Sequence, residues 1–513
     1  MLSLAYSPGY DARSFATKCL RKDEILTTCN VSNQRTPTTL VLLLAVILII
    51  PTQTAVAKET TLTLTELRKE RKMMAHRKRR IIFNNDGDDI GGHGASTPDG
   101  LLQLRTKALL GSQVDSIFYH STFGMKVIFE DGAFNRIYEY PDTRGVASRN
   151  CKALIASYGK DALDVMIDYC RKHDLEIFYS NRMNDVHDFY FPEMLSAIKV
   201  RHPEYVIGHG DKNPEETLRL MRQGKKTNTG LNFGLKVIRN LTVDAMRQVC
   251  RNYDIDGLEL DYFRSPSLFR SPVSPQEVEL HNDMMREMRK MTEEEGLRRG
   301  RPILIAARGI NDPQSSLKFG IDIETWLDED LIDILMPIHL HRQQGPLKSF
   351  FELAHHYNVS AYPCLRANET RHTWRVCRGE AMSRFAEGAD GITTFNQFDP
   401  THQRWRELGD PEILRDLNRT YTCPYYLPVT VTEDPCGPLP LLVGADMATA
   451  PTNGKRRSRK LRVQVTSLTA QHDFQLDVNG KTIATSNVSP ALTNLMQDVW
   501  LEYLPDPTIF NAG

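Results

Sequence analysis

Short runs of β-forming residues recur along residues 79–398, and most are followed by polar residues and a helix-like stretch. Strands that alternate with helices are typical of parallel βαβ units, and eight such units close a (β/α)8 TIM barrel. An open doubly wound α/β sheet is the alternative, but no Gly-x-Gly-x-x-Gly motif follows the first run. The predicted strands are 79–86, 114–122, 175–183, 256–263, 302–309, 333–340, 358–365 and 390–398. Helix-like segments between them include 152–173, 243–253, 276–296 and 377–388.

This alternation stops after about residue 425. The run 461–468 alternates apolar and polar residues, and 473–486 resembles two strands around an Asn-Gly pair, the strongest short hairpin signal. We therefore predict a (β/α)8 barrel over 79–424 and a small β-sandwich-like domain over 425–513. A sandwich is expected to need one more strand after the last strand-like run of the chain.

The longest apolar run, 40-LVLLLAVILII-50, is too short to span a bilayer, which takes about 20 residues. The small-x-small pattern 55-AVA-57 follows it, so residues 1–57 resemble a signal peptide with a long n-region, cut near Ala57. The mature protein would then be periplasmic or secreted and would begin with a charged, mobile leader over 58–78. A membrane anchor retained through 40–50 is the alternative.

The charge balance gives no sign of a nucleic-acid partner, because Lys plus Arg number 64 and Asp plus Glu also number 64. No Cys-x-x-Cys motif appears among the cysteines, so a zinc site or redox motif is not expected, and no cofactor is predicted. Export would permit disulfides. Cys423 and Cys436 are the first pair to test, and buried free thiols are the alternative.

One strand of this pattern, 256-DGLELDYF-263, carries acids among its apolar residues. Side chains alternate between the two faces of a strand, so Leu258 and Leu260 fall on one face and Glu259 and Asp261 on the other. We expect the leucines to pack against outer helices and the two acids to point into the barrel. Asp256, at the start of the strand, is expected to have a structural role.

Polar residues also follow the other predicted strands, at the end of a barrel where catalytic groups lie. We predict Asp261 and Glu259 as catalytic acids, with Glu369 or Asp399 as the partner acid. The predicted substrate-binding residues are Asn85, Asp86, Asn181, Arg182, Asn184, Asp185, His187, Arg264, Arg308, His339, His341 and Asn396.

Such a set of side chains suits the hydrolysis of a glycosidic bond, which needs one carboxylic acid to protonate the leaving oxygen and one carboxylate to attack or to activate water. A structural alternative is that Glu259 or Asp261 only forms an ion pair with Arg308 or Arg182. A non-catalytic carbohydrate-binding protein is a further alternative. A metal-dependent deacetylase, with Asp185, His187 and Asp188 as ligands, has weaker support.

The barrel resembles the glycosyl-hydrolase-like family 10 group of bacterial glycosidases over residues 79–410. The resemblance implies a (β/α)8 glycosidase without indicating its substrate. Five segments carry it: 81-IIFNNDGDD-89, 181-NRMNDVHD-188, 254-DIDGLELDYFR-264, 322-DIETWLDEDLIDILMP-337 and 389-ADGITTFNQFD-399.

The fourth predicted strand is also similar, more distantly, to the corresponding strand of two other glycosidase groups. In the α-amylase clan the pattern is Asp-Gly-x-Arg-x-Asp, and Asp256, Gly257 and Asp261 match it, although Glu259 replaces the arginine. This likeness implies Asp261 as nucleophile and a retaining reaction. In family 18 chitinases the catalytic Glu would fall on Phe263, so their mechanism is not expected.

Overall fold

The computed structural model describes residues 62–140, 145–310, 312–338, 346–365, 374–422, 441, 443–444, 459–471, 475–506 and 509. The apolar run 40–50, the pattern 55–57 and the pair Cys423 and Cys436 lie outside these residues. Within the described part of the chain, no helix combines the length and the apolar character needed to cross a membrane.

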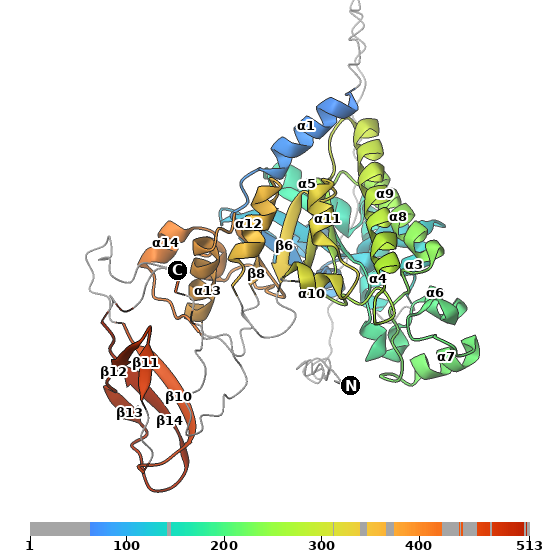
Figure 1. Ribbon diagram of the computed structural model, residues 1–513. Helices are drawn as coiled ribbons and strands as arrows, with labels where there is room; N and C mark the ends of the chain where they lie inside the picture. Colours follow the sequence, from blue (N-terminus) through green and yellow to red (C-terminus); the bar gives the residue numbers. More distant parts are fainter. Residues whose placement is uncertain are drawn as a thin grey trace, which may run out of the picture. The chain divides into compact units, whose positions relative to one another are not determined.

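The predicted (β/α)8 barrel is confirmed by the strand pairing. Within the described residues, nine short strands form one sheet in the order β7-β6-β5-β4-β3-β2-β1-β9-β8, and every neighbouring pair is parallel. β7 and β8 are two parts of one extended segment interrupted at 362–363, so this order closes into a ring of eight positions (Figure 1). The strands are β1 (Ile81–Asn85), β2 (Val114–Tyr119), β3 (Glu176–Arg182), β4 (Gly257–Asp261), β5 (Leu304–Ile310), β6 (Ile334–Ile338), β7 (Ser360–Ala361), β8 (Cys364–Leu365) and β9 (Ile392–Thr394).

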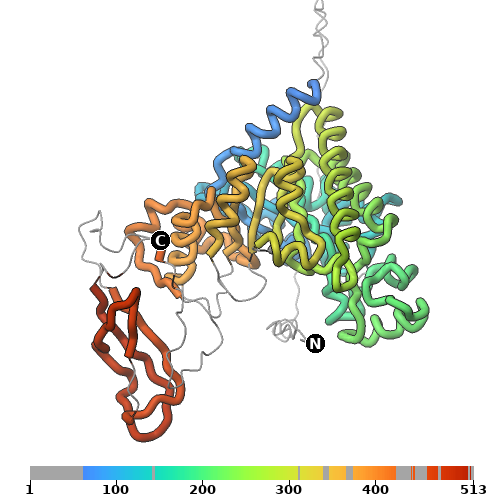
Figure 2. The backbone as a smooth tube through the Cα atoms, in the orientation of Figure 1, coloured from blue at the N-terminus to red at the C-terminus, as the bar shows by residue number. Residues whose placement is uncertain are grey.

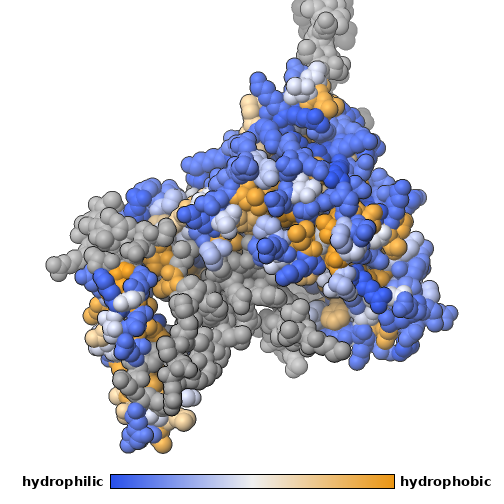
Figure 3. Space-filling model, in the orientation of Figure 1, coloured by the Kyte–Doolittle hydropathy of each residue, from blue (hydrophilic) through white to orange (hydrophobic). Residues whose placement is uncertain are grey.

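The long helix α9 (Pro275–Arg299) shows how local sequence sets the ends of an element. Ser274 and Glu277 form a capping box at its start, and Gly300 ends it in the left-handed conformation at φ 71°. Hydrophilic residues cover most of the helical surface seen in Figure 3. The other helices of this region are α2 (Pro98–Arg105), α3 (Ala133–Tyr138), α4 (Gly145–Tyr158), α5 (Ala162–Lys172), α6 (Ala197–Arg201), α7 (Pro214–Arg222), α8 (Lys236–Asn252), α10 (Pro313–Leu317), α11 (Ile323–Asp328), α12 (Lys348–His356), α13 (Trp374–Ala386) and α14 (Pro411–Asp416).

The helix predicted over 152–173 is divided in two. Gly159 adopts φ 66° after α4, which ends that helix, and Asp161 then caps α5 by accepting a hydrogen bond from the backbone N–H of Asp164. The apolar pattern runs through both helices, so periodicity alone could not reveal the break.

The barrel interior is filled by one layer of apolar side chains below a polar layer. Ile82, Phe118, Phe178 and Ala306 belong to this buried interior cluster. The residue two positions further along each of their strands is polar, and side chains two apart share a face. The polar layer towards the carboxyl ends of the strands therefore contains Asn84, His120, Ser180 and Arg308.

Helix α1 (Leu64–Ala75) packs against the amino-terminal ends of the strands, next to α9 (Figures 1 and 2). Ala75 belongs to the interior cluster of the barrel, and buried Arg71 forms ion pairs with Asp330 and Asp333. The charge of 58–78 predicted a mobile leader, and this expectation was wrong for the helix. Its arginine is matched by acids that lie far away in the sequence.

A bidentate ion pair fixes the chain between α1 and β1. Arg79 donates to the two carboxylate oxygens of Glu176 over 2.6 and 2.8 Å, and it also donates to the carbonyl oxygens of Met74 and Ala75. Both side chains of the pair are buried. The amino-terminal end of the barrel is therefore closed by packed and hydrogen-bonded groups.

The C-terminal residues form small antiparallel sheets, as expected. β10, β14 and β13 form one sheet, and β11 pairs with β12 around Asn479 and Gly480, which adopt φ 49° and 77° and so fit the predicted Asn-Gly turn. The core of this region contains Leu468, Val499 and Leu501. The strands are β10 (Leu461–Leu468), β11 (Leu476–Val478), β12 (Lys481–Ile483), β13 (Asn487–Ser489) and β14 (Gln497–Tyr503).

The barrel packing extends further along the chain than the expected limit at residue 424. Val443 is buried, and a Cβ atom added to Gly444 would lie 2.4 Å from the backbone of Met382 and Ser383 in α13. The segment at 443–444 therefore packs on the barrel. The domain boundaries remain predictions.

Candidate active site

One arginine joins the two acids of β4 inside the barrel. Arg308 Nε lies 2.9 Å from Glu259 Oε1, and Arg308 Nη2 donates to Asp261 Oδ2 over 2.6 Å. Glu259, Asp261 and Arg308 are 0%, 1% and 1% exposed, so this group is shielded from solvent. Leu258 and Leu260 face the outer core, as the alternation predicts.

A single guanidinium cannot neutralise both carboxylates. Burial disfavours the charged form of Glu259, and the negative charge of Asp261 adds to this effect, so the pKa of Glu259 is raised to about 7 although Arg308 opposes the shift. Asp261 receives a second hydrogen bond, 2.9 Å long, from the backbone N–H of Phe263. Glu259 is therefore the acid of this pair whose proton is retained near neutral pH.

A third acid reaches the barrel mouth from the turn after β1. Asp86 accepts a hydrogen bond from Arg264 Nη2 over 2.5 Å and lies 3.2 Å from Arg182 Nη2. Burial would raise the pKa of Asp86, but the charges of Arg264 and Arg182 outweigh burial and hold it well below its usual range. The following Gly87 has φ 68°, and a Cβ atom there would lie 1.6 Å from the carbonyl oxygen of His120, so the turn needs glycine.

Residues after β9 complete this part of the mouth. Arg264 Nη2 also donates to Asn396 Oδ1 over 3.1 Å, and Asn396 adopts φ 52°. The ring of Phe395 lies 4.6 Å from the guanidinium carbon of Arg264 and 5.7 Å from that of Arg308. Asn396 and Phe395 thus hold the two arginines from one side.

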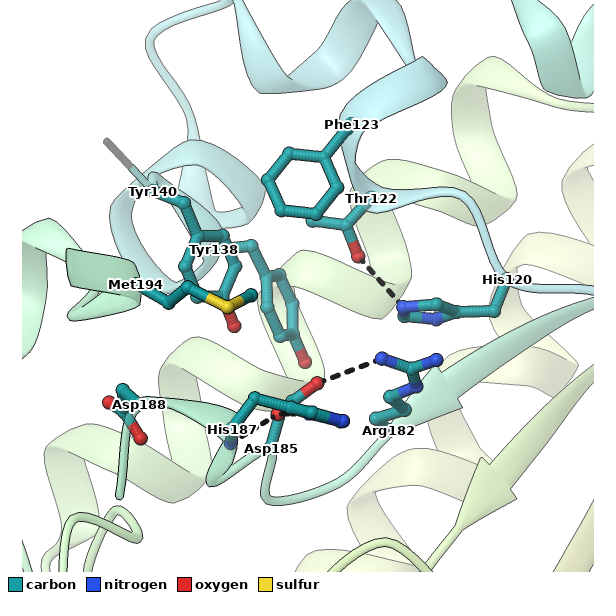
Figure 4. A pocket seen from close by; sticks show the side chains of 10 residues that line it. All are labelled: His120, Thr122, Phe123, Tyr138, Tyr140, Arg182, Asp185, His187, Asp188 and Met194. Atoms are coloured by element: carbon teal, nitrogen blue, oxygen red, sulfur yellow. Dashed lines mark hydrogen bonds and ion pairs between the residues drawn. The ribbon is translucent and has the colours of Figure 1, made fainter. Parts of the chain in front are cut away.

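A pocket opens beside this group, next to the end of β3 (Figure 4). Arg182 Nη1 donates to Asp185 Oδ2 over 3.0 Å, and His187 Nδ1 lies 2.5 Å from Asp185 Oδ1. Burial would raise the pKa of Asp185, but the hydrogen bond and charge of His187 and the charge of Arg182 hold it well below its usual range. The other lining residues are His120, Thr122, Phe123, Tyr138, Tyr140, Asp188 and Met194.

The cavity volume of this pocket is about 20 Å³. That volume holds about one water molecule. A sugar ring could therefore enter only if lining side chains or neighbouring loops move.

His120, at the end of β2, is held in its neutral form. Its Nδ1 donates to the carbonyl oxygen of Ser180 over 2.8 Å, and Thr122 Oγ1 lies 3.4 Å from its Nε2. Burial and the nearby charge of Arg182 lower the pKa of His120 to about 3. At neutral pH this ring is a hydrogen-bonding group without charge.

Three predicted substrate-binding asparagines are instead buried within the structure of their loops. Asn85 donates to Asp89 and accepts from the backbone of Gly87. Asn184 donates to the carbonyl oxygens of Leu231 and Ser267 and accepts from the N–H of Leu231, which uses its whole amide. Asn181 is fully buried, and its Nδ2 contacts the sulfur of Met183.

The metal site considered for the β3 loop loses one ligand. Asp188 accepts from Lys199 Nζ over 2.7 Å and from Thr229 Oγ1 over 2.6 Å. Among the residues that the structure describes, no group of three or more His, Cys, Asp or Glu side chains is placed to hold a metal ion. The third-strand group therefore gives no support to the deacetylase alternative.

Of the two predicted partner acids, the structure describes only Asp399, and it does not join this site. Asp399 is exposed and accepts hydrogen bonds from the backbone N–H and hydroxyl of Thr401, which lower its pKa. An exposed, readily ionised carboxyl does not suit a general acid. Glu369, His339 and His341 lie outside the described residues.

The aromatic side of the pocket was not predicted from the sequence. Phe123, Tyr138 and Tyr140 come from the segment between β2 and α4, and the two tyrosines lie about twenty residues beyond the end of β2. Tyr119, Tyr179 and Tyr262 do lie near strand ends but are buried in the outer core. Only the three-dimensional path of the β2–α4 segment brings the pocket rings to the mouth.

The chain matches no protein-family model and no curated protein. One similar solved structure is a family 36 α-galactosidase from Geobacillus stearothermophilus, with a TM-score of 0.36, 10% identity, and coverage of 83% of this chain and 56% of that chain. Another is the PgaB glycoside hydrolase domain from Bordetella bronchiseptica, with a TM-score of 0.40, 11% identity, and coverage of 67% and 99%.

A family 18 N-acetylglucosaminidase from Paenibacillus barengoltzii has a TM-score of 0.36 and 10% identity, and the match covers 64% of this chain and 97% of that chain. The chain spans little more than half the length of the galactosidase. These three solved structures are glycoside hydrolases, but at such TM-scores the likeness carries no weight for function. The resemblance to the family 10-like group stays a prediction.

Proposed function

We propose that this protein is an exported glycoside hydrolase that cleaves an oligo- or polysaccharide in the mouth of its barrel. The observation that carries the proposal is the division of the mouth acids into two protonation states. Asp86 is held ionised by Arg264 and Arg182, whereas Glu259 retains a proton near neutral pH. Carboxyl groups whose environments separate their pKa values in this way are typical of acid–base pairs in glycosidases.

Of the three acids Asp86, Glu259 and Asp261, Asp86 is the most exposed. It comes from the end of β1 and is 9% exposed, whereas the acids of β4 lie deeper. An ionised carboxylate can attack the anomeric carbon or activate a water molecule for that attack. Asp261, the nucleophile expected from the sequence, instead accepts a hydrogen bond from Arg308.

Glu259 has the protonation state of a general acid but not the exposure of one. Its carboxyl group is fully buried beside Arg308, so it keeps the mouth close to charge balance and stores a proton. The arginines Arg182, Arg264 and Arg308 then form ion pairs with Asp86, Asp185 and Asp261.

A panel of polysaccharides and oligosaccharides, assayed for released reducing ends, tests the proposal. Asp86→Asn keeps the size of the side chain and removes the charge, so turnover should fall by about 10²- to 10⁴-fold while glycan binding persists. Asp244→Asn, on the exposed side of α8, is the matched control and should change neither quantity. Full activity of the Asp86 variant would remove this residue from the mechanism.

A non-catalytic carbohydrate-binding protein is the second candidate. The observation that favours it is the complete burial of Glu259 and Asp261, both of which are ion-paired with Arg308. In that case the wild-type protein would bind a glycan of the panel without releasing reducing ends.

A further inference from the structure

Hydrolysis at this mouth needs a proton donor that the substrate can reach. Asp86 and Asp185 reach the opening, but both are held ionised, and Glu259 is buried. A group that can carry a proton and also contact a glycosidic oxygen must therefore come from another side chain. The pocket beside the mouth contains one such group.

His187 lies in the short 3₁₀ turn His187–Phe189 after β3, and its side chain is 38% exposed. Asp185 Oδ1 accepts hydrogen bonds from both the ring Nδ1 and the backbone N–H of His187, over 2.5 and 2.9 Å. The carboxylate thus assigns a proton to Nδ1 and fixes the ring orientation. The other ring nitrogen, Nε2, points away from Asp185 in Figure 4 and is the atom that can gain or lose a proton.

Asp185 is itself held in place by the mouth. Its second oxygen accepts from Arg182, whose other Nη lies 3.2 Å from Asp86. A continuous chain of contacts therefore runs from His187 through Asp185 and Arg182 to Asp86. The arrangement of a histidine, an orienting carboxylate and a nearby ionised acid is typical of proton-transfer sites.

The other charged groups around His187 are paired with one another. The carboxylate of Asp185 is the acid in direct contact with it, and Asp188 is neutralised by Lys199. Arg182 is shared between Asp86 and Asp185, and His120 is neutral. The rest of the lining is aromatic or carries sulfur: Phe123, Tyr138, Tyr140 and Met194.

We propose that His187, oriented by Asp185, is the catalytic proton donor of the proposed glycoside hydrolysis, an inference that rests on that function. As the glycosidic C–O bond breaks, its electron pair stays on the leaving oxygen, which takes the proton from Nε2. A water molecule then supplies its oxygen to the anomeric carbon and returns its proton to Nε2. The sum is one water consumed and two hydroxyl groups formed.

The first test compares two substrates that contain the sugar identified by the panel and differ in their leaving group. Oligosaccharides need protonation of the leaving oxygen, whereas a 2,4-dinitrophenyl group leaves as a stable anion without it. His187→Asn should therefore lower kcat/KM, which reports the steps up to bond cleavage, by about 10²- to 10⁴-fold on the oligosaccharide and leave kcat/KM on the 2,4-dinitrophenyl glycoside within about tenfold of wild type. Equal losses on both substrates would overturn the assignment.

His202→Asn is the matched control. His202 also contacts an acid two residues away, Glu204, over 3.1 Å, and it is similarly exposed, but it does not line the pocket. This variant should match wild type on both substrates. A His202 variant that reproduced the leaving-group effect would also overturn the assignment.

The dependence of activity on pH distinguishes a proton donor from a residue with a structural role, because only the donor adds its own titration to the profile. A donor must be protonated, so activity should fall at alkaline pH, and this limb should disappear in His187→Asn. Asp185→Asn removes the carboxylate that orients the ring and should lower kcat/KM on the oligosaccharide towards the value of His187→Asn. Because the pKa of Glu259 is raised to about 7, it titrates in the same range, and a limb lost only in Glu259→Gln would contradict the role of His187.

The outcomes separate the two proposals. If wild type hydrolyses a glycoside and His187→Asn keeps both its rate and its profile, only the histidine assignment fails. If wild type hydrolyses no glycoside, activated or not, the proposed function fails and the assignment fails with it.

Discussion

At the scale of single residues, the main feature of the barrel mouth is that Arg308 forms ion pairs with both Glu259 and Asp261. Since the pKa of Glu259 is about 7 in the folded protein and 4.5 ordinarily, the folded state binds the extra proton between these values. The stabilisation that the proton on Glu259 contributes is therefore fully present below pH 4.5 and is lost as the pH rises to about 7. Glu259 should destabilise the protein at alkaline pH.

Glu259→Gln imitates the protonated side chain and tests this linkage. The free energy of unfolding should rise relative to wild type by about 2–3 kcal/mol more at pH 8 than at pH 4, because the penalty for the buried charge disappears. Urea denaturation at both pH values measures the difference. Glu287→Gln, on the exposed side of α9, should show no pH-dependent difference. A Glu259 variant that behaved like this control would contradict the assigned protonation state.

The same arginine predicts coupling between the two acids of β4. Asp261→Asn leaves Arg308 with Glu259 alone, so the pKa of Glu259 should fall and the advantage of Gln at position 259 should shrink at pH 8. The single Asp261 variant should itself lose about 2–4 kcal/mol of stability, since it disrupts a buried ion pair. A double-mutant cycle at pH 8 measures the coupling, and additive effects of the two substitutions would refute it.

At the scale of elements, the strands were predictable from the sequence because their signal is local. The run 256–263, for example, alternates its faces over a few residues, and β4 lies within it with the predicted orientation. Parallel strands all end on the same side of a barrel. Residues at the strand ends were therefore predicted to lie close together, and Asp86, Arg182 and Arg308 do so. The roles of these residues stay predictions.

Other features depend on contacts that no local pattern contains. Asn85 and Asn184 lie at strand ends as predicted, yet the side chain of Asn85 is hydrogen-bonded within its own turn and that of Asn184 is hydrogen-bonded to Leu231 and Ser267. The break at Gly159 requires a left-handed backbone inside an apolar pattern that continues, and Tyr138 reaches the pocket from the end of the short helix α3 in the β2–α4 connection. Loop conformation decided each of these cases.

Helix α1 gives a prediction at this scale. Leu67 is 2% exposed and packs against α9, where a Cβ atom added to Gly296 would lie 3.2 Å from its Cδ1, whereas Met73 on the same helix is 63% exposed. Leu67→Ala should lower the free energy of unfolding by about 2–4 kcal/mol, and Met73→Ala should change it by less than about 0.5 kcal/mol. Equilibrium urea unfolding measures both, and equal effects would show that α1 does not stabilise the barrel.

At the scale of the whole molecule, export is proposed from the apolar run 40–50 and the pattern 55–57. Expression of the full chain in a bacterial host, followed by fractionation and N-terminal sequencing, should give a periplasmic or secreted product that begins near Lys58. Replacing Ala55 and Ala57 by arginine should block cleavage, while replacing Thr61 and Thr63 by arginine should not. A cytoplasmic product that retains Met1 would contradict the proposed export.

The two folded regions should also be separable, because their apolar cores form distinct clusters. The chain packs on α13 up to Gly444, and β10 begins at Leu461, so the connection between them carries the basic sequence 455-KRRSR-459. Trypsin at low concentration should cut there first and leave a barrel fragment with the thermal transition of the intact barrel. Replacing these basic residues by glutamine should delay that cut and nothing else. Rapid cleavage within 304–338, which includes β5 and β6, would instead contradict the closed barrel.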